Sequence, residues 1–327
     1  MSTDTAAGAP SGERRTPRRQ CADAVLMVRP ASFGYNAQTA ATNKFQQQSS
    51  DGAAEAEAAL KEFDGLRAAL TGEGVRVCVV DDTFEPQKPD AVFPNNWVSF
   101  HEDGTVVLYP MQAENRRHER RGEVVDEVAD RLGFKISRLI NLTSHEAHGR
   151  YLEGTGSLVL DHVAKTAYAC MSPRTHAAVV QEWAKELGYE PIFINAFDPA
   201  GVPLYHTNVL MCIGERVAIV GTEAIVAADR GPIVERLRAT GREVVEVGYA
   251  EIEHFAGNML ELGTWDEALG DYRVLVMSET ARHALPAEAL ARLSACTDEV
   301  LAVPIPTIEK VGGGGVRCML AEVFLPA

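Results

Sequence analysis

The chain has 327 residues, 46% of them hydrophobic, and its 46 acidic and 31 basic side chains give a net charge of −15. This charge argues against nucleic acid or an anionic membrane as the main partner, and no apolar run approaches the roughly 18 residues that span a bilayer. The N-terminus lacks the apolar core of a signal peptide, so we expect a cytoplasmic protein with reduced cysteines.

The N-terminal residues 1–20 contain no large apolar side chain and are rich in Ser, Thr, Gly, Pro and Arg. This composition is typical of a disordered tail, so we expect one catalytic domain over residues 21–327. That domain opens with a strand at 24–30. A helix at 54–74 follows, with Leu60, Phe63, Leu66 and Leu70 at helical spacing, and then a strand at 75–80.

The same order of elements then returns four times, as two strands, a helix and a closing strand. The predicted elements lie at 90–100, 105–111, 120–134 and 135–142; at 151–161, 166–171, 174–188 and 190–197; at 205–214, 216–221, 231–241 and 242–248; and at 254–262, 272–278, 286–296 and 300–306. Asn96, Gly156, Asn208 and Asn258 fall at equivalent points, 60, 52 and 50 residues apart. A repeat of this length indicates supersecondary units that bury their apolar faces against their neighbours.

Five units result if the N-terminal portion shares one with a final strand around Cys318, which suggests closure into a ring. An ordinary open α/β sheet would explain the alternation of elements. It would not explain why unusual polar residues recur at one point of each unit. In a ring these points converge on the axis.

The polar residues at these points are Asp90, Asn95, Asn96, Glu153, His206, Asn208, Asn258 and Cys318. A thiol, an imidazole and a carboxylate are the parts of an activated-thiol site. A free cysteine is most often a small buried hydrophobe, the role expected of Cys78, Cys170, Cys212 and Cys296. The motif "HEAH" at 145–148 spaces its histidines three apart, where a zinc-protease helix needs four, and no metal or cofactor is expected.

The motifs "KPDAVFPNNW", "LEGTGS", "SPRTH", "YHTNV" and "GGGGVRCM", in this order, resemble the guanidino-group-modifying superfamily of arginine deiminases, dimethylarginine hydrolases and amidinotransferases. The early "MVRPASFGYNAQTAATNKFQ" further resembles its citrulline-utilisation branch, also described as arginine-deiminase-related. The resemblance implies a five-bladed α/β propeller (pentein) of ββαβ units, which agrees with the repeat count.

The same resemblance implies roles for single residues. Cys318 matches the nucleophile, His206 the general acid/base and Glu153 its acidic partner. Arg116 and Arg174 match positions that hold the substrate α-carboxylate, although Arg117 is an alternative to Arg116. Asp90 matches an acidic residue near the substrate amino end.

Two departures from the family pattern point to the substrate. Asn96 and Asn208 stand where deiminases commonly carry aspartates that bind a guanidinium, and a buried cation would be costly without those partners. An amide both donates and accepts, which suits a neutral ureido group. We therefore expect hydrolysis of citrulline to ornithine, ammonia and carbon dioxide through an S-carbamoyl cysteine.

Other functions stay open at this point. The nearest is deimination or demethylamination of arginine or a methylated arginine, and amidinotransfer is less favoured. A non-catalytic binding propeller, like the ribosome-binding factors of this fold, or an inactive metabolite sensor would be of another class. We also expect the segment 31–46 to cover the cavity mouth, with Phe33 and Asn36 as candidate contacts, the glycines 312–315 to form a mobile lid or strand entry, and a possible homodimer.

Overall fold

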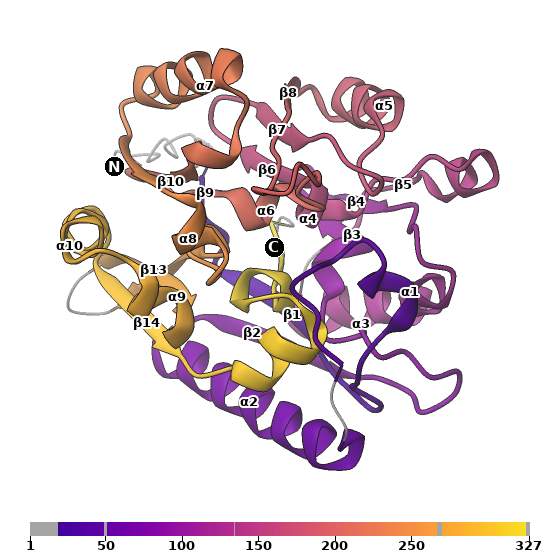
Figure 1. Cartoon of the computed structure of the whole chain (residues 1–327). Helices are drawn as coiled ribbons and strands as arrows, with labels where there is room; N and C mark the ends of the chain where they lie inside the picture. Colours follow the sequence, from indigo (N-terminus) through magenta and orange to yellow (C-terminus); the bar gives the residue numbers. More distant parts are fainter. Residues whose placement is uncertain (1–18, 49–50, 134, 267–269, 325–327) are drawn as a thin grey trace, which may run out of the picture.

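The computed structural model describes residues 19–48, 51–133, 135–266 and 270–324. Its strands form five separate three-stranded sheets, and each sheet combines one antiparallel pair with one parallel pair. Figure 1 shows these sheets arranged around the C-terminal segment. The chain is thus a mixed α/β protein of small sheets, as the alternating strands and helices predict.

Each sheet has the same internal order of strands. The first strands are β3 (Val98–Phe100), β6 (Leu158–Asp161), β9 (Met211–Ile213), β12 (Leu260–Asp266) and β15 (Ala321–Glu322). The middle strands, antiparallel to them, are β4 (Thr105–Leu108), β7 (Thr166–Cys170), β10 (Val217–Gly221), β13 (Gly270–Ser278) and β1 (Ala24–Arg29). The outer strands, parallel to the middle ones, are β5 (Arg138–Asn141), β8 (Glu190–Ile194), β11 (Glu243–Val247), β14 (Glu299–Val303) and β2 (Arg76–Asp81). The predicted sharing of one sheet between the two ends of the chain is confirmed, because β15 pairs with β1.

Helices join each middle strand to its outer strand and cover the periphery in Figure 1. They are α2 (Gly52–Gly72), α3 (Gly122–Leu132), α5 (Ala177–Leu187), α7 (Ala227–Ala239), and the pair α9 (Glu279–Ala284) and α10 (Ala287–Ser294). Helix α2 begins at Asp51, whose side chain accepts a hydrogen bond from the Ala54 amide. It buries Phe63, Leu66 and Leu70 as predicted, each contributing about 1.5–3 kcal/mol through burial. Leu60, the fourth predicted residue, is only half-buried, and Ala59 is buried beside it.

The predicted first strands are only partly strands. Short helical turns form their leading halves: η1 (Pro94–Asn96), α4 (Gly154–Ser157) and α6 (Thr207–Leu210). Glycine permits this because a turn packs directly against its neighbour: a Cβ on Gly154, whose φ is +47°, would lie 2.1 Å from the Asn95 carbonyl oxygen. The polar residues of the repeat therefore lie on turns, which aim side chains differently from a pleated strand.

The C-terminal segment also differs from the single apolar strand expected around Cys318. A π-helix, η5 (Ile308–Gly312), leads into the glycines, and a 3₁₀ helix, η6 (Val316–Met319), carries the cysteine before β15. Helical turns of this kind are common at functional sites. The cysteine thus lies on a turn, like the polar residues of the other units.

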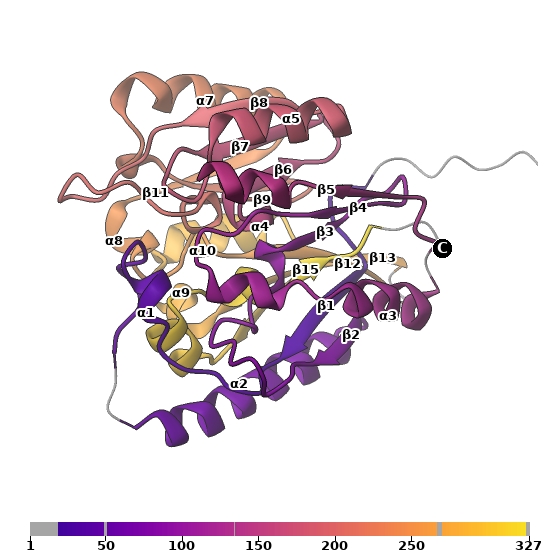
Figure 2. The ribbon, with the colours of Figure 1, turned by 90° about the vertical axis from the view of Figure 1, so that its right-hand side faces the viewer.

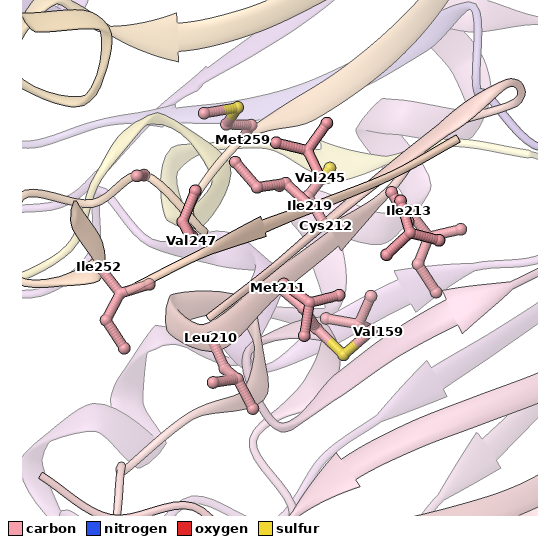
Figure 3. Close-up of a cluster of buried hydrophobic side chains, with 14 of the residues drawn as sticks. Val159, Leu210, Met211, Cys212, Ile213, Ile219, Val245, Val247, Ile252 and Met259 are labelled. Carbon is pink, nitrogen blue, oxygen red and sulfur yellow. The ribbon is translucent and has the colours of Figure 1, made fainter. Parts of the chain in front are cut away.

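Buried apolar side chains link neighbouring sheets. Figure 3 shows Val159 of β6, Met211 of β9 and Val245 of β11 in one cluster with Met259, which precedes β12. The first strands therefore pack on one another through side chains, which holds the turns that precede them in a fixed relation.

At the N-terminus, residues 1–18 of the predicted tail lie outside the described residues. Gln20, its last residue, is buried, and its side chain donates hydrogen bonds to the carbonyls of Leu160 and Ile213. The packed part of the chain therefore includes residue 20. Among the described residues, no helix combines the length and apolarity needed to cross a membrane.

Candidate active site

The candidate nucleophile, Cys318, is buried and only 3% exposed. Its Sγ accepts hydrogen bonds from the side-chain amides of Asn208, at 3.4 Å, and Asn258, at 3.3 Å. Burial raises the pKa of the thiol, and these two amides oppose that rise. The thiol is therefore protonated at neutral pH, and the two side-chain amides can donate hydrogen bonds to a thiolate once the proton is lost.

His206 and Glu153 form a buried pair. The Nε2 atom of His206 lies 2.9 Å from Oε2 of Glu153, whose other oxygen accepts from the Gln112 amide at 3.1 Å. Each residue stands at the start of a helical turn, His206 before α6 and Glu153 before α4. The turns therefore aim two side chains, distant in sequence, at each other.

The charges around this pair set its protonation. Burial would raise the pKa of Glu153, but Arg174, His206 and Arg116 outweigh it, and the pKa lies well below the usual range. Burial lowers the pKa of His206 to about 4; Glu153 opposes the shift, while Arg174 and Arg116 add to it. A neutral imidazole thus donates from Nε2 to an ionised Glu153, which leaves Nδ1 as a basic nitrogen.

Arg174 is the cation nearest to Glu153, with Nη1 3.4 Å from Oε2. Its Nη2 atom donates to the Thr39 carbonyl at 2.7 Å and to the Thr42 hydroxyl at 2.8 Å. The guanidinium also stacks over the ring of Tyr205, 5.0 Å from its centroid. Arg174 therefore lies between the pair of His206 and Glu153 and the segment that contains α1 (Ala37–Ala40).

Arg116 is completely enclosed. It pairs through two 2.8 Å hydrogen bonds with Glu119 and donates from Nη1 to Oδ1 of Asn96 at 2.8 Å. Its guanidinium also lies 3.7 Å from Asp90 and 4.0 Å from Glu153. These contacts differ from the role expected of it: in this state Arg116 holds carboxylates of the protein together and has little capacity left for a substrate carboxylate.

The alternative to it, Arg117, turns away and lies 3.3 Å from Glu146. Its side chain is 27% exposed. Of the two arginines, the structure therefore brings Arg116 to the site.

Asp90 presents a carboxylate to the same region. Its Oδ2 accepts hydrogen bonds from Asn36 at 2.8 Å and from Thr39 at 2.9 Å, whereas Oδ1 is buried without a partner. Burial raises its pKa, and Arg116 opposes the rise. An unpaired, buried carboxylate oxygen is costly, so Oδ1 is a ready acceptor for a ligand cation or N–H group.

These residues surround one pocket. The predicted residues that line it are Asp90, Asn96, Arg116, Arg174, His206 and Cys318, joined by Thr39, Asn43, Phe93, Tyr205, Gly312, Gly313 and Gly314. Glu153 is bonded to His206, and Asn208 is bonded to Cys318. The pocket therefore gathers residues from three leading turns, η1, α6 and η6, from the segments after β4 and β7 that carry Arg116 and Arg174, and from the segment around α1.

The covering segment behaves as expected for residues 31–46. Asn43 donates to the Gly313 carbonyl at 3.0 Å, and Asn36 reaches Asp90. Phe33 is buried and packs instead beside Gly312. Figure 2 shows α1 near one end of the molecule, on the left of the view.

The glycines 312–315 serve close packing. All four are buried, and an added Cβ would meet Phe93 at 2.8 Å from Gly312 and Asn258 at 2.7 Å from Gly315. At Gly313 the left-handed backbone, φ +66°, also places a Cβ 2.5 Å from Gln46. The close approach of neighbouring groups therefore explains this glycine run.

Tyr205 and Glu119 are among the site residues that were not predicted from the sequence. Tyr205 immediately precedes His206 in "YHTNV", and its hydroxyl donates to the Gly313 carbonyl at 2.7 Å. Glu119 follows Arg116 by three residues, a spacing that brings side chains together on a helical turn. Within the described ranges, no group of three or more His, Cys, Asp or Glu residues is arranged to hold a metal ion.

Gly156 provides a sharp test of this geometry. A Cβ there would lie 2.4 Å from Nδ2 of Asn96 and 2.7 Å from Nδ1 of His206. We expect Gly156→Ala to displace the imidazole and lower kcat/KM by about 10²-fold, the usual cost of a misplacement near 1 Å. Gly231→Ala on α7, where an added Cβ meets nothing within 4 Å, is the matched control, and equal steady-state rates for the two variants would contradict the placement of His206.

Comparison with known protein families finds one model that matches most of the chain. The family model for eukaryotic N,N-dimethylarginine dimethylhydrolase matches residues 29–325. No curated protein sequence matches the chain.

Three solved structures share the fold. Apo ArgZ, an arginine dihydrolase from the ornithine-ammonia cycle in cyanobacteria, has a TM-score of 0.70 at 18% identity over 93% of this chain, which spans 41% of ArgZ. Unliganded AgrE gives 0.70 at 19% identity, with coverage of 93% and 39%. A dimethylarginine dimethylaminohydrolase adduct with S-methyl-L-thiocitrulline gives 0.64 at 16% identity, with coverage of 92% and 99%.

Proposed function

This chain belongs to the N,N-dimethylarginine dimethylhydrolase family, and on that premise we propose that it is a cysteine hydrolase cleaving a C–N bond at the end of an arginine-derived side chain. The observation that carries the proposal is that Cys318 and His206 line one pocket with Asp90 and Arg174. That pocket therefore combines a nucleophile and a base with one group of each charge, which suits a zwitterionic amino acid.

We also interpret the five sheets as blades of a five-bladed α/β propeller. Contacts between successive leading turns support this: η1 contacts α4, α4 contacts α6, and η6 contacts η1. Gly257, before β12, packs against the Val209 carbonyl of α6, and Gly315, before η6, packs against Asn258. These two contacts link the remaining neighbouring units. A single catalytic domain over 21–327 and a homodimer remain predictions.

The first half of the reaction starts from a neutral thiol and a neutral imidazole. Nδ1 of His206 accepts the thiol proton as the Cys318 sulfur attacks the terminal carbon of the side chain. The imidazolium then gives that proton to the departing nitrogen, so the C–N bond breaks and the carbon stays on sulfur. Glu153 stabilises the transient imidazolium and keeps the ring oriented.

The second half uses one water molecule. His206 removes a proton from the water as its oxygen attacks the thioester-like carbon, and the carbon–sulfur bond breaks. The proton returns to sulfur, which restores the thiol. With citrulline as substrate, ornithine leaves in the first half and carbamate, which decomposes to ammonia and carbon dioxide, leaves in the second.

We propose citrulline as the substrate because of the amide groups beside the thiol. The side-chain oxygen of Asn96 accepts a hydrogen bond from Arg116, and its Nδ2 atom has no partner. The side-chain nitrogen of Asn208 donates to Cys318, and its Oδ1 atom has no partner. A ureido group accepts through its oxygen and donates through its nitrogens, so it matches both. A guanidinium only donates and would leave the Asn96 N–H groups unsatisfied, a cost of about 1–3 kcal/mol per buried group.

For the other end of the amino acid, we propose that Asp90 binds the α-ammonium and Arg174 the α-carboxylate. Arg116 holds Asp90, Glu119 and Glu153 in place. These assignments place the two charged ends against the covering segment and the neutral ureido group against Cys318.

Arginine or a methylated arginine is the second candidate. The unpaired Oδ1 of Asp90 would also suit a guanidinium, if the substrate bound with its guanidino end, and not its α-ammonium group, against Asp90. ArgZ is an arginine dihydrolase, and a structure of its N-terminal domain holds a covalently bound reaction intermediate. Both observations favour a guanidino substrate as the alternative.

Product analysis separates the candidates. We expect purified protein to convert citrulline to ornithine and ammonia, and the Cys318→Ala variant to form neither. Citrulline made from arginine, or dimethylamine made from dimethylarginine, without turnover of citrulline itself would overturn the ureido assignment and support the guanidino one. No turnover of any of the three would count against the enzyme class and favour a binding function.

A further inference from the structure

We propose that Asn258 is a further catalytic residue, whose side-chain amide donates to the Cys318 sulfur and stabilises the thiolate that attacks the substrate. It is 1% exposed and lies on the segment before β12, 60 residues from the cysteine in sequence. The proposal rests on the proposed function, because it assigns a role to this residue in the same reaction.

The orientation of the amide follows from its other contacts. Oδ1 of Asn258 accepts a hydrogen bond from the backbone amide of Arg317 at 3.1 Å. Nδ2 donates to the Asn208 carbonyl at 3.0 Å and to the Cys318 sulfur at 3.3 Å. Since a backbone N–H must face an oxygen, the nitrogen of the amide is the atom nearer to the sulfur.

The same side chain serves both protonation states of the sulfur. As a thiol, Cys318 directs its S–H toward Oδ1 of Asn258, at 3.8 Å. As a thiolate, it keeps the N–H donor at 3.3 Å. The sulfur can therefore lose its proton without any movement of Asn258.

The site needs such donors because its imidazole is neutral. Thiolates are commonly stabilised by an adjacent imidazolium, but His206 is bonded to Glu153 and its pKa is lowered. The titratable or charged groups that share the pocket with Cys318 are Asp90, Arg116, Arg174, Tyr205 and His206, and Arg317 precedes it in the chain. Arg116 and Arg174 are bonded to protein acceptors, so the direct donors to sulfur are the amides of Asn208 and Asn258.

The local backbone is built to hold this amide. Phe255 adopts a left-handed conformation with φ +63°, which is unusual for a large side chain. The backbone N–H of Asn258 donates to the Phe255 carbonyl at 2.8 Å, which closes a turn. Strain of this kind persists where surrounding contacts impose it, and it clusters at functional sites.

The test measures the ionisation of Cys318 directly, through the pH dependence of its alkylation by iodoacetamide. Rates from a Cys318→Ala protein are subtracted to remove the other cysteines. We expect Asn258→Ala to shift the midpoint upward by about one pH unit and to slow alkylation at pH 7 by about tenfold. Asn258→Asp should shift it further, because it places a negative charge beside the sulfur. Asn195→Ala, at an exposed asparagine on the loop after β8, is the matched control.

An alkylation profile for Asn258→Ala that coincides with the wild-type profile would overturn the proposal, even if kcat fell. If the alanine variant fails to fold, Asn258→Leu keeps a similar side-chain volume without a donor, and its midpoint should also rise; a midpoint equal to the wild type's would again overturn the proposal. Because alkylation needs no substrate, the result does not depend on whether citrulline or arginine is turned over. Failure of the proposed function would instead show as absent turnover with an intact alkylation profile.

Discussion

Replacing Cys318 by serine is expected to lower the turnover rate by at least about 10⁴-fold, the scale seen when a nucleophile is removed from a catalytic set. The hydroxyl nearly matches the thiol in size and can accept the bonds from Asn208 and Asn258, so the fold should be retained. Its much higher pKa, however, leaves it a poor nucleophile for a neutral imidazole to activate. The measurement is the initial rate of ornithine or citrulline formation, beside thermal unfolding of the same sample.

Cys296→Ser is the matched control, because Cys296 is a free, partly buried cysteine that does not line the pocket. It should retain wild-type turnover. A Cys318→Ser protein within tenfold of wild type would contradict the assignment of the nucleophile. Mass spectrometry of the quenched wild-type reaction should further find a carbamoyl or amidino group on Cys318, according to the substrate.

Neutralising Glu153 is expected to have the second-largest effect. Glu153→Gln should lower kcat by about 10²–10⁴-fold, because the imidazolium formed during proton transfer loses its anionic partner. Glu153→Ala should also lower the free energy of unfolding by about 3–5 kcal/mol, the usual cost of leaving buried partners unpaired. Those partners are Arg174 and His206.

The pH dependence of stability gives an independent readout of this carboxylate. The pKa of Glu153 is lower in the folded protein than its usual value of 4.5, so the unfolded chain binds more protons as the pH falls. Its contribution to stability is therefore present above about pH 4.5 and is lost below that pH. Glu153→Gln should flatten this acid-side slope in denaturant unfolding, whereas Glu288→Gln at an exposed position of α10 should not. An unchanged slope in the Glu153 variant would mean that the carboxylate is not held ionised by its neighbours.

Much of this architecture can be predicted from the sequence, because short apolar strands and amphipathic helices recur along the chain in a constant order. Helix α2 follows from the spacing of its apolar residues, and the shared sheet of β15 and β1 follows from the count of units. The family predicted from five short motifs is confirmed by the family model. Asn96, Gly156, Asn208 and Asn258 do stand at equivalent points, each two or three residues before a first strand.

The remaining features depend on contacts that no local pattern carries. A four-residue helical turn such as α6 looks like the start of an apolar strand, since it is too short to show a helical period. The pairing of Arg116 with Glu119 can be recognised only in the folded structure. The same is true of the role of Asn258, which depends on its distance to a sulfur 60 residues away in sequence. The glycines before Cys318 signal unusual backbone, but only packing distinguishes close approach from mobility.

The hydrogen bonds of Thr39 with Arg174 and Asp90 bear on how a ligand would bind in the pocket. Its carbonyl accepts a hydrogen bond from Arg174, and its hydroxyl donates one to Asp90. Thr39 therefore makes the contacts with this pair that the carboxylate and the ammonium of an amino acid would make. Thr39 is thus an internal surrogate for the two charged ends of the amino acid that we propose binds here. In the proposed binding mode, the contacts of Thr39 with Arg174 and Asp90 are exchanged for similar contacts of the ligand, and the new contact at the charged end is the one to Oδ1 of Asp90. In that mode, discrimination between amino acids depends mainly on the far end of the side chain.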